Sequence, residues 1–213
     1  MKPMLSKEYL KKVKSLYYTK GYSAREVGEE LNVSIDAVYK FMIRYDLERR
    51  TFEETNRIRF EKKSLSYCIK KNLTEKEKQL KIACIMLYWA EGSKKRHRNK
   101  GQRRGATVDL ANSDPDMIRL FLRFLREICR VDEKRLRIYL YCYANQDVNS
   151  LKKYWCKVTN VPMNQFIKPY VREDFSLEKI GVMKYGLIHV RYSDTKLFDQ
   201  LFIWIKNYLD NNL

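Results

Sequence analysis

The sequence predicts an α+β protein, in which an all-α N-terminal domain precedes a domain of mixed helices and strands. Residues 1–50 carry helix signals only, with an N-cap followed three residues later by a glutamate at Ser23–Glu26. After residue 73, alternating polar and apolar segments, which are typical of half-buried strands, stand between helical segments. We therefore expect a domain over residues 1–50, a charged helical connector over 51–73 and a second domain over 74–213.

Composition indicates a polyanionic partner. The 213 residues are 45% hydrophobic, which suffices for a real core, and the net charge is +18. Nucleic acid is the commonest partner of such a chain. A membrane partner is not expected, because the longest apolar run, Ile82–Ala90, is shorter than the ~17–25 residues that span a bilayer. The scattered cysteines, without a CxxC pair, predict buried thiols in a reducing cytoplasm.

The first domain reads as three helices. A helix is expected over residues 7–19 and ends at Gly21; a second runs from the Ser23 cap to about Leu31. Asn32 stands at a sharp turn, where asparagine tolerates the left-handed conformation, and Ser34 caps a third helix that runs to about Tyr45. The expected shared apolar seam comprises Val27, Leu31, Val33, Ile35, Val38 and Met42.

Two short helices joined by a tight turn make the helix-turn-helix plan. The segment SAREVGEELNVSIDAVYKFMIRYDL closely resembles helix-turn-helix domains of bacterial DNA-binding proteins in its spacing. The resemblance implies that the second helix of the pair faces the major groove with Asp36, Ala37, Tyr39, Lys40 and Arg44. Lys40 is expected to contact a base or a phosphate, and Arg44, Arg49 and Arg50 to contact phosphates. A helical bundle that binds protein is the alternative.

The second domain begins with a helix that ends in an acid. Thr74 and Glu77 form a capping box, and the helix should run to Gly92, where freedom to adopt a positive φ suits a helix stop. Glu91 then lies in the last turn, where the helix dipole disfavours a negative charge by about 0.3–1 kcal/mol. Compensation is expected from a bound divalent metal or from the basic residues that follow: Lys94, Lys95, Arg96, Arg98, Lys100, Arg103 and Arg104.

Further elements follow from periodicity and caps. Asp114 caps, and Pro115 begins, a helix that continues over Asp116–Arg130. Another helix is expected over residues 147–158, and an amphipathic one closes the chain over Asp194–Leu209. The expected strands are Ala106–Ala111, Arg137–Tyr143, Gln165–Val171 and Lys184–Tyr192, and the loop Arg172–Lys179 shows no clear pattern.

Residues 84–92, CIMLYWAEG, align without gaps to the nine-residue signature of the LAGLIDADG family. The stretch from LYWAEGSK through NSDPDMIRLFLRFL to the last strand and helix also resembles bacterial proteins that join a helix-turn-helix to one LAGLIDADG-like domain. This resemblance covers roughly residues 75–210. It implies an α-β-β-α-β-β-α domain with a curved antiparallel sheet that lies on the DNA major groove.

The resemblance also implies a site. Members include homing endonucleases, RNA maturases and transcription regulators, and in the nucleases two signature helices each deliver their last acid to a shared pair of metal sites. Here that acid is Glu91, with the carbonyl of Ala90 or Gly92 nearby, and Mg²⁺ or another divalent cation suits such ligands. With one signature per chain, a nuclease must be a homodimer. The helix face expected at its interface comprises Ala83, Met86, Leu87 and Ala90, although Met86 replaces the family's glycine.

Other candidate catalytic residues are basic side chains near the last strand, Arg191 and Lys196, together with Lys94 after the acid and Asp109 on a strand. An ordinary surface role for Asp109, and a salt bridge to the basic run for Glu91, are the alternatives.

Three functions stay open. They are a metal-dependent endonuclease acting on double-stranded DNA, a non-catalytic DNA-binding regulator that dimerises through the same fold, and an RNA-binding factor with base-stacking tyrosines at Tyr139, Tyr141 and Tyr143.

Overall fold

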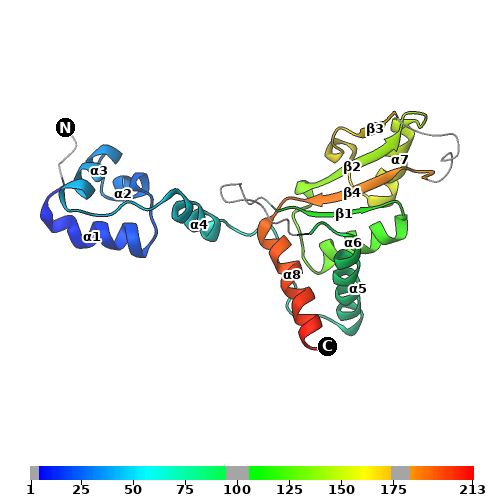
Figure 1. Cartoon of the computed structure of the whole chain (residues 1–213), viewed down its shortest axis with the longest axis horizontal. Helices are drawn as coiled ribbons and strands as arrows, with labels where there is room; N and C mark the ends of the chain where they lie inside the picture. Colours follow the sequence, from blue (N-terminus) through cyan, green and yellow to red (C-terminus); the bar gives the residue numbers. More distant parts are fainter. Residues whose placement is uncertain (1–4, 95–105, 174–182) are drawn as a thin grey trace. The chain divides into compact units, whose positions relative to one another are not determined.

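The structure, a computed structural model, describes residues 5–94, 106–173 and 183–213. The chain divides into two compact units, Met1–Ser64 and Leu65–Leu213, whose helices and strands are labelled in Figure 1. Each unit has its own hydrophobic core. The segment 51–73, predicted as one connector, is therefore divided between the units. Among the described residues, no helix has the length and apolar character needed to cross a membrane.

The first unit is all-helical, as predicted. Its elements are η1 (Lys7–Tyr9), α1 (Leu10–Lys14), the π-helical turn η2 (Ser15–Thr19), α2 (Ala24–Glu30), α3 (Ile35–Arg44) and α4 (Phe52–Lys62). The first three follow one another directly and fill the helix predicted over residues 7–19, and Gly21 at φ +65° follows them. The seam residues Val27, Val33, Val38 and Met42 are buried, while Leu31 and Ile35 pack at its border.

The caps and the turn of the helix pair are confirmed. The Ser23 N–H donates to Glu26 Oε2 at 2.6 Å, and the Glu26 N–H donates to Ser23 Oγ at 3.2 Å. Ser34 Oγ accepts from the Ala37 N–H at 3.1 Å, which fixes the start of α3. Asn32 adopts φ 53°, the left-handed conformation expected of it. Local side-chain chemistry therefore sets the boundaries of both helices.

Helix α4 has its own capping box, which was not among the predicted caps. The Thr51 N–H donates to Glu54 Oε2 at 2.8 Å, and the Glu54 N–H donates to Thr51 Oγ1 at 3.2 Å. The far end of α4 is attached to the turn after η2, where Lys62 Nζ donates to the Gly21 carbonyl at 2.9 Å. This contact explains why α4 belongs to the first unit.

The second unit mixes helices and strands. Its order is α5 (Glu75–Glu91), β1 (Val108–Asn112), α6 (Pro115–Glu127), η3 (Glu133–Arg135), β2 (Leu136–Tyr143), α7 (Val148–Thr159), η4 (Met163–Gln165), β3 (Tyr170–Arg172), β4 (Leu187–Tyr192) and α8 (Thr195–Asp210). Every predicted helix is present. The strand predicted over Gln165–Val171 is reduced to β3, and the one predicted over Lys184–Tyr192 begins at Leu187.

The sheet has the order β1-β4-β2-β3. Strand β4 pairs antiparallel with both β1 and β2, but β2 and β3 run parallel, so the prediction of a purely antiparallel sheet is wrong. The reason is the connection. Because α7 carries the chain back along the sheet, β3 starts from the same end as β2, as parallel pairing requires. The predicted strand pair between α5 and α6 is also reduced, since the described residues there hold β1 and one bridge between Gly92 and Leu110.

One face of the sheet forms the core. Alternate residues such as Val108, Leu110, Ile138 and Val190 are fully buried, and α5, α6 and α8 lie on this side of the sheet in Figure 1. The side chains between them point the other way and are half-buried or exposed. We call this second surface the open face; on strands β1, β2 and β4 it carries Asp109, Ala111, Arg137, Tyr139, Tyr141, Tyr143, Leu187, His189 and Arg191.

The start of the second unit is attached to its last strand by a polar network. Ser66 Oγ donates to Asp194 Oδ2 at 2.5 Å, and the Tyr192 hydroxyl donates to the Ser66 carbonyl at 2.5 Å. The Cys68 N–H also donates to the Cys129 carbonyl at 3.0 Å. These contacts join residues far apart in sequence and explain why the unit begins near Leu65.

Candidate functional site

The carboxyl end of α5 is built around a close contact between Gly92 and Tyr88. Gly92 has φ −78° and ψ 164°, an ordinary extended conformation, so the predicted need for a positive φ is wrong. The glycine is required by space instead. A Cβ at residue 92 would lie 2.4 Å from Tyr88 Cδ2 and 2.6 Å from the Tyr88 carbonyl oxygen, distances that real Cβ atoms do not show. The buried Tyr88 ring therefore fixes where the chain leaves the helix.

Lys94 neutralises the helix end, but not through Glu91. Its Nζ donates to the Trp89 carbonyl in the last turn of the helix, and at 3.3 Å to the Tyr88 carbonyl, which also accepts the Gly92 N–H at 2.8 Å. Glu91 is exposed, and within the described ranges its carboxylate makes no ion pair or hydrogen bond. The acid of the signature is therefore accessible to a ligand, while Lys94 has a structural task.

A short strap connects this helix end to the sheet. Gly92 bridges Leu110, and the Ser93 N–H donates to the Asp109 carbonyl at 2.8 Å. The Ser93 hydroxyl lies 3.0 Å from the Tyr88 hydroxyl and donates to the Thr107 carbonyl at 3.0 Å. Burial raises the pKa of Tyr88, so its hydroxyl remains protonated near neutral pH. The strap holds Glu91 next to β1, the edge strand that carries Asp109.

Asp109 is the centre of a charged cluster on the open face. Its Oδ1 lies 2.9 Å from His189 Nδ1, and its Oδ2 lies 3.2 Å from Arg191 Nε. The Arg191 contact is an ion pair without hydrogen-bond geometry, because Arg191 Nε has no hydrogen-bond partner although it is buried. Asp109 and Arg191 were predicted as site residues and are directly opposite on β1 and β4. His189 was missed; its alternate position with Arg191 in the predicted strand was the available signal.

Aromatic rings continue the open face away from this cluster. The Tyr139 ring lies 5.7 Å from the His189 ring, and Tyr141 stacks on Tyr170 with centroids 4.8 Å apart. Arg172 lies over the Tyr143 ring at 5.9 Å. The three tyrosines of β2 therefore point away from the core, and each contacts a side chain from another strand. All three are half-buried. Arginine and stacked aromatic groups are suited to contact nucleic acid.

The outward face of α3 matches the predicted DNA-contacting surface in part. Asp36, Lys40 and Arg44 are exposed, whereas Ala37 and Tyr39 are half-buried and pack at the border of the core. The Arg49 guanidinium lies 4.4 Å from the centroid of the Tyr39 ring, which it covers. A basic side chain thus stands beside the face of the helix that was expected to enter the groove.

Arg50, which was predicted to contact a phosphate, is half-buried and makes contacts inside the first unit. Its guanidinium lies 4.1 Å from the centroid of the Tyr17 ring and donates through Nη2 to the Tyr22 carbonyl. Its backbone N–H donates to the Tyr17 hydroxyl at 3.2 Å. The half-buried side chain thereby links the segment after α3 to Tyr17 and Tyr22. The sequence alone could not predict this role, because it depends on the tertiary fold.

Helix α5 has an exposed apolar face close to Glu91. Ile82 and Trp89 are 41% and 46% exposed, Ala83 and Ala90 are exposed, and Met86 is half-buried between them. We call these residues the α5 face. Of the four residues predicted for a dimer interface, Met86 and Leu87 are half-buried and pack against the unit's own core, and Leu87 is the one outside the α5 face. The remaining three lie on this face.

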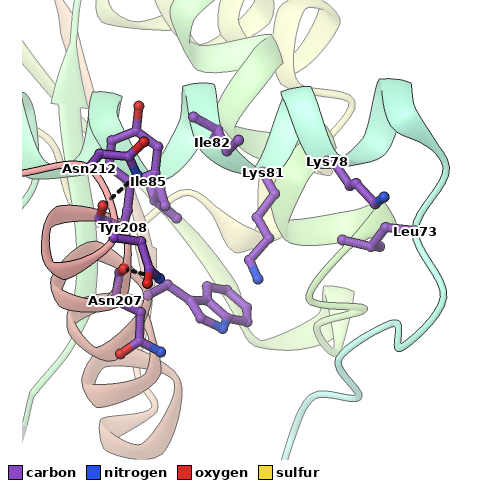
Figure 2. A pocket seen from close by; sticks show the side chains of 10 residues that line it. Leu73, Lys78, Lys81, Ile82, Ile85, Asn207, Tyr208 and Asn212 are labelled. Atoms are coloured by element: carbon purple, nitrogen blue, oxygen red, sulfur yellow. Dashed lines mark hydrogen bonds between the residues drawn. The ribbon is translucent and has the colours of Figure 1, made fainter.

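A groove of about 340 Å³ lies between the first half of α5 and the end of α8 (Figure 2). Lys81 projects across it, with Nζ 4.2 Å from the centroid of the Trp204 ring, and burial lowers the pKa of this lysine. Ile82, Ile85 and Tyr208 contribute the apolar wall. Because Glu91 stands at the opposite end of α5, this groove is separate from the acid site.

The structure does not gather all the predicted site residues. Lys196 is the second residue of α8, where its backbone N–H donates to the cap Asp194, and it lies outside the strands that pair Asp109 with Arg191. Lys95, Arg96, Arg98, Lys100, Arg103 and Arg104 lie outside the described residues. Within the described residues, no group of three or more His, Cys, Asp or Glu side chains is arranged to hold a metal ion.

No known family, curated protein or solved structure matches this chain.

Proposed function

We propose that this chain binds specific sites in double-stranded DNA and cleaves them as a homodimer in the manner of LAGLIDADG nucleases, using a divalent cation. The observation that carries the proposal is the environment of Glu91. Its carboxylate is exposed and, within the described residues, unpaired, and it stands directly beside the exposed apolar α5 face. An acid at the unfavourable end of a helix, next to a surface suited to pairing, is the arrangement that a shared metal site between two copies requires.

DNA binding rests on the helix pair of the first unit. Two capped helices enclose a turn with Asn32 in the left-handed conformation, and α3 presents Asp36 and Lys40 to solvent. In helix-turn-helix proteins, the second helix of the pair lies in the major groove. The net charge of +18 adds the non-specific attraction to phosphates on which such binding depends.

Dimerisation rests on the α5 face. Ile82, Met86 and Trp89 follow a helical stripe with Ala83 and Ala90 beside them. Each large apolar side chain gains roughly 1.5–3 kcal/mol when fully buried, and the two alanines allow a second helix to approach. A second copy packed on this face would bring its Glu91 close to the first.

A hard divalent cation fits the donors that such a dimer would offer. One chain supplies the Glu91 carboxylate and the carbonyl of Gly92 or Ala90, too few oxygens for a metal site without water or a partner. Two chains supply two carboxylates, a set that suits Mg²⁺ with bound water. When bound, the cation would stabilise the negative charge that develops on phosphate oxygens during hydrolysis.

The test is cleavage by the full chain. Purified protein, a library of random duplexes and Mg²⁺ should yield cut or nicked products, and Glu91→Gln should abolish cleavage while leaving duplex binding within about twofold. Glu75→Gln is the matched control, since Glu75 lies in the first turn of the same helix and pairs only with Lys78 at 2.7 Å among the described residues. Undiminished cleavage by the Glu91→Gln variant would remove this acid from the reaction.

A non-catalytic regulator is the second candidate. It is favoured by Met86, which fills the helix face where the family has a glycine, and by the cluster in which Asp109 already neutralises Arg191. This function requires site-specific binding that EDTA does not change and no cleavage with any divalent cation. Both candidate functions require a protein that binds DNA. The buried thiols of Cys84 and Cys129 suit a reducing cytoplasm.

A further inference from the structure

One exposed apolar side chain stands near the carboxyl end of α3, next to charged residues. Ile43 is 77% exposed, the highest exposure among the large apolar residues of helices in the described part of the chain. A single exposed isoleucine is common on protein surfaces, so exposure alone decides nothing. Its position gives it significance, because the surrounding exposed residues of the helix are charged.

Ile43 lies on the same helix face as the residues expected to read DNA. Asp36, Tyr39, Lys40 and Ile43 follow the spacing i, i+3, i+4 and i+7, which places them in one row along the helix. Homeodomains, a variant of the helix-turn-helix, read the major groove with helix residues at this same spacing. Ile43 is therefore the last residue of a row with this spacing on α3.

Ile43 is not part of the core of the first unit, nor of the partly buried residues packed against it. The core of the first unit is formed from the opposite side of α3 by Val38, Phe41 and Met42, all nearly or fully buried. A β-branched residue is also a weaker helix former than the lysine or alanine that an exposed helix position usually carries. An isoleucine here thus lacks a structural reason within the described residues.

The neighbours of Ile43 would hold the helix on a duplex. Lys40 lies one turn before it, Arg44 follows it directly, and Arg49 covers the Tyr39 ring at 4.4 Å. Cations that flank an apolar contact suit the major groove, where phosphates border the base edges. On those edges the only methyl group is the C5-methyl of thymine, and apolar side chains contact it.

We infer that Ile43 is a specificity residue of α3 that packs on the C5-methyl group of a thymine in the major groove. This inference rests on the proposed binding of duplex DNA by the helix pair and adds to it the base that one side chain selects. Lys40, on the same row, then contacts a base edge or phosphate one turn away. Cleavage is not needed for this contact, so binding measurements test it.

The experiment compares thymine with uracil, which lacks only the methyl group. The full chain first selects its binding site from random duplexes, and each thymine of that site is then replaced singly by uracil. We expect one thymine in each half-site at which uracil weakens binding about fourfold, the effect of losing one buried methyl group. In the Ile43→Ala variant, thymine and uracil at that position should bind equally.

A matched control is Ile203→Ala, which removes the same atoms from an isoleucine that is 50% exposed on α8. It should keep the full preference for thymine. Equal binding of thymine and uracil at every position by the natural chain, or a preference that survives in Ile43→Ala, would overturn the inference while leaving DNA binding intact. Failure to select any duplex would instead overturn the proposed function, and the inference with it.

Discussion

Asp109 Oδ1 lies 2.9 Å from His189 Nδ1, across two neighbouring strands and 80 residues apart in sequence. The same carboxylate pairs with Arg191 through its other oxygen at 3.2 Å. One acid therefore restrains two side chains on the open face, and its charge offsets that of Arg191. A phosphate that approaches this face meets less positive charge than Arg191 alone would present.

Replacing this acid should strengthen the attraction of the protein for DNA. In Asp109→Asn, Arg191 loses its counter-charge and becomes available to a phosphate. Each additional phosphate contact steepens the dependence of log affinity on log salt by about 0.9 on duplex DNA. We expect this change in slope from binding titrations of the full chain between low and moderate salt.

Asp116→Asn is the control for net charge. Asp116 is exposed on α6 and pairs with Arg119 at 2.6 Å, away from the open face. It changes the formal charge by the same amount but should leave the slope nearly unchanged. Equal effects from both variants would show that the open face has no special part in DNA binding.

The contact between Gly92 and Tyr88 predicts a second outcome. Gly92→Ala introduces a Cβ 2.4 Å from the buried ring, and overpacking of this kind costs about 1–3 kcal/mol. All three tryptophans, Trp89, Trp155 and Trp204, belong to the second unit, so their fluorescence during urea unfolding reports the stability of this unit.

A double variant separates the clash from a general intolerance. Tyr88→Leu alone removes a buried ring and destabilises the unit, but it also removes the ring atoms that Gly92→Ala meets, while the Tyr88 carbonyl oxygen stays in place. The two changes together should therefore cost less than their sum, by the part of the clash that the ring contributes. Additive costs would contradict the contact with the Tyr88 ring as the reason for the glycine.

Low pH should destabilise the start of α5, because Glu77 then becomes protonated. Hydrogen bonds from Lys70 Nζ at 2.5 Å and from the Thr74 N–H at 2.9 Å hold the pKa of Glu77 below its usual value. A carboxyl with a lower pKa in the folded state stabilises the fold fully above its unfolded pKa, about 4.3, and this stabilisation is lost as the pH falls through the folded value. Glu77→Gln should thus destabilise the second unit at pH 7 and much less near pH 3, as measured by tryptophan fluorescence in urea.

Glu75→Gln is again the appropriate comparison, because Glu75 lies in the same turn but makes only an exposed pair with Lys78. Exposed pairs contribute little, so its effect should be small at both pH values. A Glu77→Gln variant whose deficit is the same at pH 7 and pH 3 would mean that the charge of this residue is unimportant.

The helix caps show which features of the fold could be predicted from the sequence. Caps at Ser23, Ser34, Thr74 and Asp114 were predictable because each involves a side chain and an amide two or three residues away. The same holds for the left-handed Asn32. Helix positions and the helix pair therefore followed directly from local chemistry.

Interactions between distant segments were not predictable in this way. The parallel pairing of β2 with β3 depends on the path of α7, and the pairing of Asp109 with His189 depends on which strands become neighbours. The reason for Gly92 was misjudged because a neighbouring ring, and not the backbone conformation, requires it. Within the candidate site, Glu91 was named from the motif, but the sequence did not predict that Lys94 donates to the helix-end carbonyls while the Glu91 carboxylate has no partner among the described residues.

The cysteines should differ sharply in reactivity. Burial raises the pKa of Cys84 to about 12 and raises that of Cys129 as well, so neither forms a thiolate near neutral pH. Cys68 is exposed and Cys156 is half-buried, so the prediction of buried thiols is wrong for Cys68. Titration of the folded full chain with an aromatic disulfide at pH 8 should therefore show Cys68 as the fastest thiol, which Cys68→Ser removes, and release of Cys84 and Cys129 only in denaturant. A fast phase that persists in Cys68→Ser would contradict the described burial.

The two neighbouring arginines after α3 should separate stability from DNA binding. Arg50 lies against Tyr17 and donates to the Tyr22 carbonyl, whereas Arg49 covers the more outward Tyr39 ring. Arg50→Ala should lower the stability of the first unit by about 1–3 kcal/mol, because it leaves a half-buried carbonyl without its donor. Hydrogen exchange of the peptide around Tyr17–Tyr22 in the intact chain would report this loss, since the unit contains no tryptophan.

Arg49→Ala should have the opposite profile. An exposed cation over a ring contributes about 0.5–1 kcal/mol to folding, so hydrogen exchange should change little. If Arg49 contacts a phosphate, its loss should instead reduce the salt slope of DNA binding by about 0.9. Arg50→Lys distinguishes the roles further, because lysine keeps the charge but cannot reproduce the planar stacking on Tyr17 together with the Tyr22 hydrogen bond. If hydrogen exchange around Tyr17 is unchanged in both Arg50 variants while the salt slope of DNA binding is reduced, Arg50 contacts DNA and does not stabilise the first unit.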